Sequence, residues 1–180
     1  MNGKRLPLLA CVLLVCATLC GCGAKRQIQE DKAVAEISQL GAVVECDEES
    51  RGKPVIRVSF TDPQVADADI ERLKGFAQLQ TLYLNGTQVT DAGLKHLEGF
   101  TKLQHLGLKR TRITDAGLVH LKGLTQLRWL VLDGTKVTDA GLAHLKGLTQ
   151  LQTLHVHRTK VTEAGVNDLQ KALPDVRIER

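Results

Sequence analysis

The feature that most constrains the fold is a repeat of 24 residues. Four copies begin at Leu79, Leu103, Leu127 and Leu151, and a degenerate copy begins at Val55. No insertion or deletion interrupts these five copies. A fixed period of this length is typical of proteins that stack one small structural unit, in which each unit buries its apolar face against the next.

Each copy changes its apolar period once. In the copy that starts at Leu79, Leu82 and Leu84 alternate as in a strand, whereas Leu94, Leu97 and Phe100 have the spacing of a helix face. One strand and one helix cannot bury their own apolar faces. Stacked copies bury them, and this predicts a curved solenoid with a parallel sheet on its concave side and helices on its convex side.

Threonine, an acid and glycine mark the expected ends of each helix. The threonines precede the helix as N-caps, at Thr90, Thr114, Thr138 and Thr162. The acids follow in the first turn, where they favour the helix dipole, at Asp91, Asp115, Asp139 and Glu163. The glycines stand near the helix end, where we expect a left-handed residue, at Gly75, Gly99, Gly123 and Gly147.

The pattern LxxLxLxxTxVTDAGLxxL resembles the leucine-rich repeat, in the TDAGL-type variety common in planctomycete-like bacteria. The resemblance covers residues 55–174 and implies an α/β leucine-rich-repeat solenoid of about five repeats. Threonine stands where many such repeats place asparagine, and its hydroxyl is suited to part of that side chain's backbone bonding; these residues are Thr87, Thr111, Thr135 and Thr159. Pro63 breaks this column, so we expect the first copy to lie at an edge.

Both ends of the array are expected to be capped, because a bare solenoid end exposes its core. Residues 28–40 predict an amphipathic helix, 42–46 a strand and 47–54 a polar turn, which together form an N-terminal cap over 28–54. At the other end, Val176 and Ile178 predict a short closing strand within residues 175–180.

The first residues predict export and anchoring. A positive start and an apolar run of about fifteen residues, shorter than a membrane span, favour a secretory signal over residues 1–21. The run ends in LCGC, which resembles a bacterial lipobox and implies lipidation of Cys22, a tether over 22–27 and a place in the bacterial cell envelope facing the periplasm or exterior. An uncleaved anchor, or a signal whose cysteines are incidental, stays open.

The open face of the sheet is the candidate binding surface. Side chains alternate along a strand, so the third, fifth and seventh residues of each copy should line the concave side. The only tryptophan and the only tyrosine fall in these columns, which vary while the core columns barely change. We expect a protein or peptide partner to contact Arg57, Tyr83, Asn85, His105, Lys109, Trp129, Asp133, His155 and His157.

The stretch TLHVHRT raises a second hypothesis, a metal site. His155 and His157 share one face of a strand, and Asp133 stands 24 residues before His157, so the three form a two-histidine, one-carboxylate set. The alternative is cross-strand charge pairing through Lys109, Asp133 and His157, and a polar binding face explains both histidines without a metal. Three further histidines recur at the repeat period on the convex side, where we expect no shared site: His96, His120 and His144.

Composition excludes little but favours a binding protein over an enzyme. The net charge of +4 is too weak to indicate nucleic acid by itself. We find no phosphate-cradling glycine loop and no nucleophile elbow, and we expect no cofactor. Basic residues along the rim after the strands suit an acidic partner or a solvated edge. We expect a monomer, and a purely structural envelope spacer remains the plainest alternative.

Overall fold

The computed structural model describes the backbone of residues 21–180 and the side chains from Glu30 onward. The predicted signal peptide, apart from its last residue, and the side chain of Cys22 lie outside this part of the chain. Among the helices that the model describes, none combines the length and apolarity needed to cross a membrane.

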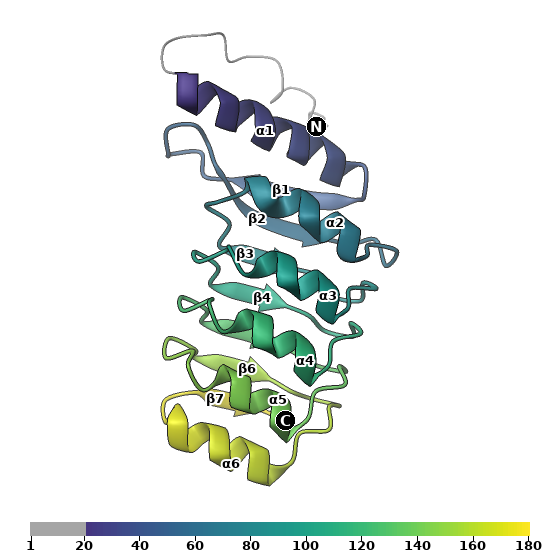
Figure 1. Ribbon diagram of the computed structural model, residues 1–180, viewed down its shortest axis with the longest axis vertical. Helices are drawn as coiled ribbons and strands as arrows, with labels where there is room; N and C mark the ends of the chain where they lie inside the picture. The colour runs from purple at the N-terminus through teal and green to yellow at the C-terminus, as the bar shows by residue number, and fades with distance from the viewer. Residues whose placement is uncertain (1–20) are drawn as a thin grey trace, which may run out of the picture.

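One seven-stranded sheet runs through residues 21–180, with its strands in chain order (Figure 1). The strands are β1 (Ala42–Cys46), β2 (Val55–Phe60), β3 (Thr81–Tyr83), β4 (His105–Gly107), β5 (Trp129–Val131), β6 (Thr153–His155) and β7 (Arg177–Glu179). The first pair, β1 and β2, is antiparallel, and every later pair is parallel. The sheet stays open, because β1 and β7 lie at opposite ends of the order.

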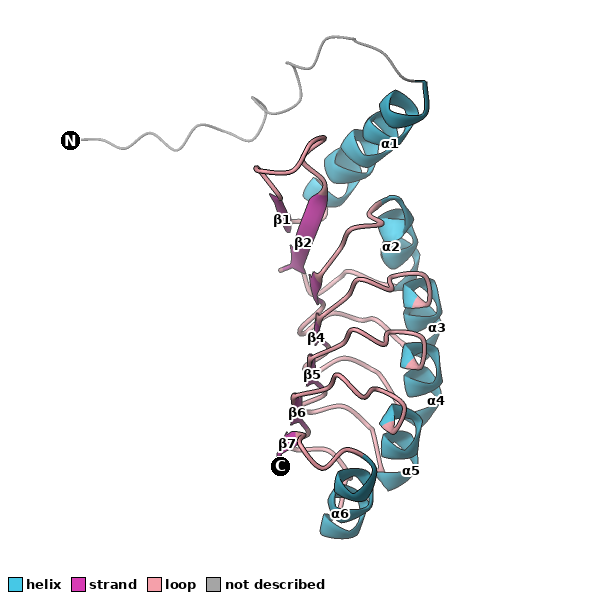
Figure 2. Ribbon diagram, turned by 90° about the vertical axis from the view of Figure 1, so that its left-hand side faces the viewer, coloured by secondary structure: helices cyan, strands magenta, loops and turns pink. Residues whose placement is uncertain are grey.

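The helices form a second layer on one side of the sheet, so that strands and helices occupy opposite sides of an arc (Figure 2). The α-helices are α1 (Gly21–Ser38), α2 (Asp67–Glu71), α3 (Asp91–Leu94), α4 (Asp115–Leu118), α5 (Asp139–Leu142) and α6 (Glu163–Ala172). Four 3₁₀ turns continue them, η2 (Arg72–Gly75), η3 (Lys95–Leu97), η4 (Val119–Leu121) and η5 (Ala143–Leu145). The fold is therefore the predicted α/β solenoid.

The core fills the space between the two layers. In the repeat that begins at Leu79, the apolar residues of both periods are buried, from Leu82 on the strand to Leu94 and Leu97 on the helix, and Phe100 is 5% exposed. The same columns are buried in the following repeats, so one continuous core cluster joins all turns. Each repeat closes the core of its neighbour, as the stacking argument requires.

A ladder of aspartate and threonine joins the helix starts. Asp115 Oδ1 accepts from the backbone N of Thr138 at 2.7 Å, and Asp115 Oδ2 accepts from the Thr138 hydroxyl at 2.7 Å. The Thr138 hydroxyl in turn accepts from Ala140 N, so the predicted N-cap is confirmed. The same two bonds join Asp67 to Thr90, Asp91 to Thr114 and Asp139 to Thr162.

The ladder also accounts for the glycine of the TDAGL pattern. A Cβ at Gly141 would overlap Asp115 Oδ1, and the glycine at the same place in each neighbouring repeat meets the equivalent aspartate. The first-turn acid was expected only to favour the helix dipole. Its main contact in the structure is the next repeat, so aspartate, threonine and glycine act together as one inter-repeat joint.

A second column of threonines lies inside the turn after each strand. The Thr111 hydroxyl donates to the Leu108 carbonyl at 2.7 Å, and Thr87 and Thr135 make the same bond at 2.7 and 2.6 Å. These three side chains are buried. The expectation that these hydroxyls bond to the backbone is thus confirmed.

The left-handed glycine expected after each helix is wrong. Among the described residues, the glycines at positive φ are Gly41, Gly52, Gly86 and Gly134, all outside that column. The chain instead turns through a 3₁₀ segment, after which Phe100 N donates to Leu97 O at 3.0 Å and Thr101 N to Gly99 O at 3.0 Å. These tight turns close the helix end without a left-handed residue.

The N-terminal end is covered by α1 and the β1–β2 hairpin. The sequence placed the helix at 28–40, whereas α1 begins at Gly21 and ends at Ser38, so the residues predicted as a tether are helical. Most of Ala24 to Gln27 are good helix formers, which explains the longer helix. Ile37 is fully buried, and Arg72 Nη1 donates to Glu36 Oε2 at 2.9 Å, which fixes α1 to the first repeat.

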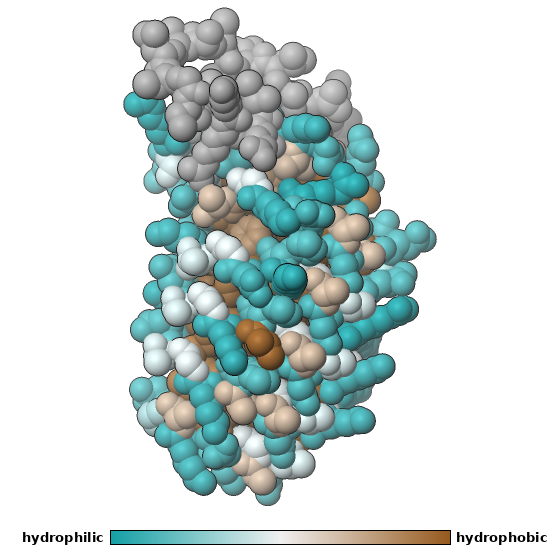
Figure 3. All heavy atoms as spheres, viewed as in Figure 1, coloured by the Kyte–Doolittle hydropathy of each residue, from teal (hydrophilic) through white to brown (hydrophobic). Residues whose placement is uncertain are grey.

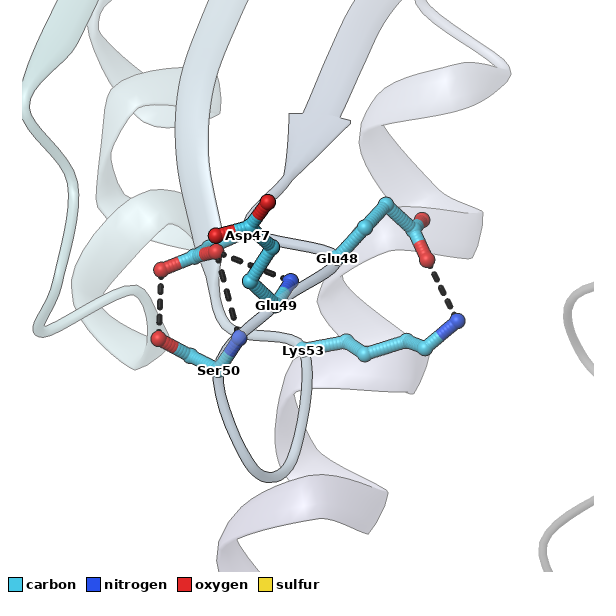
Figure 4. A network of polar contacts seen from close by, with 5 residues as sticks. All are labelled: Asp47, Glu48, Glu49, Ser50 and Lys53. Atoms are coloured by element: carbon cyan, nitrogen blue, oxygen red, sulfur yellow. Dashed lines mark hydrogen bonds and ion pairs between the residues drawn. The ribbon is translucent and has the colours of Figure 1, made fainter.

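The connection between β1 and β2 is the predicted polar turn (Figure 4). Asp47 Oδ1 accepts from the backbone N of Glu49 and of Ser50, at 3.1 and 3.2 Å, and Lys53 pairs with Glu48. Because β1 pairs with β2, the first repeat is not an edge, contrary to the expectation from Pro63. At the other end, β7 closes the sheet beside β6.

Candidate functional site

The register of the sheet brings equivalent residues of successive repeats side by side. The third-position column runs Arg57, Thr81, His105, Trp129, Thr153 and Arg177. The fifth-position column runs Ser59, Tyr83, Gly107, Val131, His155 and Glu179. Residues that pair on neighbouring strands are 24 positions apart in the sequence. The equivalent positions of the repeats, predicted to line the concave side, are therefore neighbours across the sheet.

A stripe of aromatic rings crosses the concave face; we call His105, Trp129, His155 and His157 the ring stripe. The centroids of His105 and Trp129 lie 5.9 Å apart at 74°, those of Trp129 and His155 6.0 Å apart at 35°, and those of His155 and His157 6.2 Å apart at 47°. Trp129 is 41% exposed although its strand neighbour Leu130 is fully buried. Each ring restricts its neighbours, so the stripe offers ordered aromatic surface.

His105 lies at the N-terminal end of the stripe in a half-buried setting. Burial lowers the pKa of His105, and the nearby charges of Arg57 and Arg128 lower it further. Its Nδ1 lies 3.4 Å from the Thr81 hydroxyl. Near neutral pH this imidazole is therefore uncharged, and it presents a flat, weakly polar ring beside Trp129.

Tyr83 and Asn85 form a separate group beside the stripe. A Cβ at Gly107 would lie 2.7 Å from Tyr83 Cδ1 and 2.9 Å from Asn85 Oδ1, so the missing side chain makes room for both. Asn85 Oδ1 also accepts from Lys109 N at 2.9 Å. Asn85 thus has a structural role, because it joins the turn after β3 to the turn after β4. Half-buried Tyr83 presents part of its ring on the concave surface.

Two predicted contact residues are engaged by other parts of the chain. Arg57 Nη1 lies 3.3 Å from Glu45, its partner residue on β1, so this guanidinium is tied to the N-terminal cap. Asp133 Oδ1 accepts from His157 N at 2.9 Å, the same bond that Asn85 makes with Lys109 N two repeats earlier. Among the described residues, no ion pair joins Asp133 to Lys109, so the expected charge pairing between them is absent and Lys109 is exposed.

The C-terminal end of the stripe meets an acid that the sequence interpretation missed. His155 Nδ1 lies 3.1 Å from Glu179 Oε2, and His157 Nε2 lies 4.0 Å from the same oxygen. Glu179 Oε1 lies 2.9 Å from Arg177 Nη2. Glu179 stands 24 residues after His155, so extending the repeat period into the last strand would have found it.

The comparisons with known proteins agree with this geometry. Residues 77–137 match the leucine rich repeat family. Internalin C2 from Listeria monocytogenes is similar in structure, with a TM-score of 0.52 and 20% identity over 81% of this chain and 80% of that chain. The chain folds as a leucine-rich-repeat solenoid.

Further solved solenoids are similar to this one. An internalin (InlF) of Listeria monocytogenes aligns with a TM-score of 0.50 and 22% identity, over 86% of this chain and 51% of that chain. The leucine-rich-repeat ectodomain of the receptor kinase SOBIR1 from Arabidopsis thaliana aligns with a TM-score of 0.50 and 16% identity, over 84% of this chain and 90% of that chain. No curated protein matches the sequence. At these identities the likeness shows the fold alone.

The rim of the leucine-rich-repeat solenoid carries arginine where its turns favour glycine. The residue after the seventh position has positive φ in every full repeat: Gly86 at 75°, Arg110 at 55°, Gly134 at 68° and Arg158 at 57°. A side chain in this conformation is strained, and strain of this kind is often kept where the side chain is needed. Both arginines are exposed, and Arg158 directly follows His157 of the ring stripe, so they add positive charge to the rim of the sheet.

The convex face of the leucine-rich-repeat solenoid offers less. Figure 3, which views this side, shows mainly hydrophilic residues with small apolar spots among them. The recurring histidines lie there, and His120 Nδ1 pairs with Glu98 at 2.6 Å across one repeat. A shallow hollow of about 490 Å³ is lined by Lys74, Lys95, His96 and neighbours, outside the ring stripe. The ring stripe is therefore the better candidate site.

Proposed function

We propose that this protein is a non-enzymatic, lipid-anchored module of the bacterial cell envelope that binds a protein or peptide partner on its concave sheet. The observation that carries the proposal is the ring stripe, with Trp129 41% exposed at its centre on an otherwise closely packed frame. The leucine-rich-repeat fold is typical of protein-interaction modules, which are generally not enzymes.

The chemistry of the face supports a polypeptide ligand. A large exposed aromatic residue flanked by ordered rings is the usual centre of a protein interface, because it buries much area at little cost in conformational entropy. Lys109, Arg110 and Arg158 are exposed beyond the strand ends and carry positive charge, which favours acidic side chains at the edge of the partner. The sheet holds all of these groups on one rigid surface.

The anchor is proposed from the N-terminal sequence. If Cys22 is acylated, α1 leads from the lipid directly into the cap, at about 1.5 Å of rise per residue. The solenoid would then stand close to the membrane surface. Replacing Cys22 with serine is expected to abolish metabolic labelling with palmitate and to release the protein from the membrane fraction. Continued lipid labelling of the variant would contradict the anchor.

Site-specific photo-crosslinking in the native cell tests partner binding. A photoreactive amino acid replaces Trp129, and a matched control replaces Val119, which is 40% exposed on the convex side. A discrete crosslinked protein from position 129 alone is the expected result. Products of equal yield from both positions, or none from position 129, would remove the concave-face proposal and favour a structural spacer.

A further inference from the structure

The C-terminal end of the ring stripe gathers metal-ligating groups from two adjacent repeats. One oxygen of Asp133 and one ring nitrogen each of His155 and His157 all lie within 4.8 Å of one another. Among the residues that the structure describes, this is the only such group of three. Asp133 follows β5, whereas both histidines belong to β6 and the turn after it, so the sheet itself sets their separation.

The spacing is close to that of a divalent metal site. Zinc binds imidazole nitrogen and carboxylate oxygen at about 2.0–2.2 Å, so tetrahedral ligand atoms lie about 3.3–3.5 Å apart. Donors within 4.8 Å reach this spacing through small side-chain rotations, without movement of the sheet. Asp133 is already oriented, because its Oδ1 accepts from His157 N at 2.9 Å, which leaves Oδ2 for a ligand.

Glu179 supplies the outer contact that histidine ligands usually have. A ligating histidine donates its second ring N–H to a carboxylate, which fixes the tautomer and the ring orientation. Glu179 Oε2 lies 3.1 Å from His155 Nδ1, and a proton on Nδ1 leaves the Nε2 lone pair free for a metal. Arg177 holds the other oxygen of Glu179 at 2.9 Å, so this carboxylate is itself positioned.

We propose that Asp133, His155 and His157 bind a divalent transition metal ion of the zinc class, with Glu179 as the positioning residue for His155. Two imidazoles and one carboxylate favour zinc-like ions over calcium or magnesium, which prefer oxygen ligands alone. Basic residues border the site, but Lys109, Arg110 and Arg158 are exposed and screened by salt. The site lies within the proposed partner-binding face, since it shares His155 and His157 with the ring stripe, but metal binding does not require the partner.

Zinc titration of the full chain, purified in detergent and freed of metal by a chelator, tests the proposal. We expect binding of one equivalent by calorimetry, and a rise in Tm with free zinc concentration. Loss of a ligand in His157→Gln should weaken binding by at least about 100-fold, and Glu179→Gln by about 10–100-fold, as for outer-shell partners of metal ligands. His120→Gln, the same change on the convex side, should leave the affinity within about twofold, because its ring lies outside the metal-ligating group.

Asp133→Asn separates ligation from folding. The amide oxygen keeps the bond to His157 N, as Asn85 does for Lys109 N, while the charged ligand is lost. We expect this variant to have unchanged Tm in chelator and at least about 10-fold weaker zinc binding. Absence of zinc binding, an affinity unchanged by His157→Gln, or an equal loss in His120→Gln would overturn the proposal. Trp129→Ala should retain zinc binding, which keeps this result separate from partner capture.

Discussion

At the start of each helix, four successive repeats carry threonine, an acid, alanine and glycine in the same order, whereas no concave column keeps one residue through those four repeats. The two regions belong to the same 24-residue unit and have the same period. They differ in what their side chains touch. The ladder side chains contact the next repeat through two short hydrogen bonds, while the ring stripe faces the open side of the sheet.

This difference explains which part of the unit is free to vary. A ladder position needs the aspartate of one repeat and both the threonine and the glycine of the next, so a change in any one affects both repeats. A concave position needs only a residue that is compatible with the extended backbone of a strand. The frame is therefore fixed by mutual contacts, and its open face is left to carry recognition.

The largest effect should follow a methyl group added to the ladder. Gly141→Ala is expected to lower the free energy of unfolding by about 2–3 kcal/mol, because the new Cβ displaces Asp115 from Thr138. Urea denaturation followed by circular dichroism measures this. In Gly147→Ala nothing lies within 4 Å of the new Cβ, so a change of no more than about 0.5 kcal/mol is expected. Equal losses in both variants would contradict the ladder account.

A matched pair of aspartates in two adjacent repeats sharpens the comparison. Asp115→Asn should destabilise by about 1–2 kcal/mol, because one of the two acceptors that hold Thr138 becomes a donor. Asp133→Asn should change stability by less than about 0.5 kcal/mol, because Asn85 shows that an amide makes the same backbone bond. The urea midpoints of both variants measure these changes. A larger loss in Asp133→Asn than in Asp115→Asn would contradict the view that Asp115 holds the repeats together and Asp133 mainly serves the concave face.

Removal of the central ring should affect binding more than folding. Trp129→Ala is expected to cost about 1–2 kcal/mol of stability, since the residue is 41% exposed but its two ring contacts, with His105 and with His155, are lost. Partner capture should fall to background. Val119→Ala, an exposed apolar control on the convex side, should retain capture. If the Trp129→Ala protein is unfolded, the ring stripe is needed for folding and is not a surface reserved for binding.

Replacing a rim arginine should increase stability while it weakens partner binding. Arg110→Gly is expected to raise the free energy of unfolding by about 0.5–1 kcal/mol, because glycine adopts φ of 55° without a Cβ conflict. The same change should weaken partner capture if the guanidinium faces an acidic ligand. Arg112→Gly, two residues later and outside the left-handed set, should give no gain. Thermal denaturation of the two variants makes the test, and stabilisation by both would argue against local strain.

The smallest effect concerns pH. The pKa of His105 is lowered below the ordinary value of 6.5, so the folded state binds a proton less readily than the unfolded chain. Its contribution to stability is complete above about pH 6.5 and falls as the pH drops below that value. The loss of urea midpoint between pH 7.5 and 5.5 should be smaller in His105→Gln than in the parent. An equal loss in both would show that His105 does not titrate differently on folding.

The repeat allowed the candidate face to be predicted almost completely. His105, Trp129 and His155 share the concave side because the period of 24 sets the register and the strand alternation sets the face. Glu179 was missed because the last strand lacks the repeat motif around it. The bonds of Asn85 and Asp133 to the following turn were also missed, because a side chain at the end of a strand can point to solvent or to backbone with the same sequence spacing.

The sequence by itself determined the solenoid, its five-copy array, the strand columns and the N-caps, because each depends on a period or on contacts a few residues apart. The tertiary structure decided what joins the copies. Asp115 and Thr138 are 23 residues apart, and only stacking shows that one carboxylate accepts both threonine donors and excludes a Cβ at Gly141. It likewise added Glu179 to Asp133, His155 and His157, which their spacing had already grouped, and it set the distances among them, since these depend on rotamers that no spacing encodes.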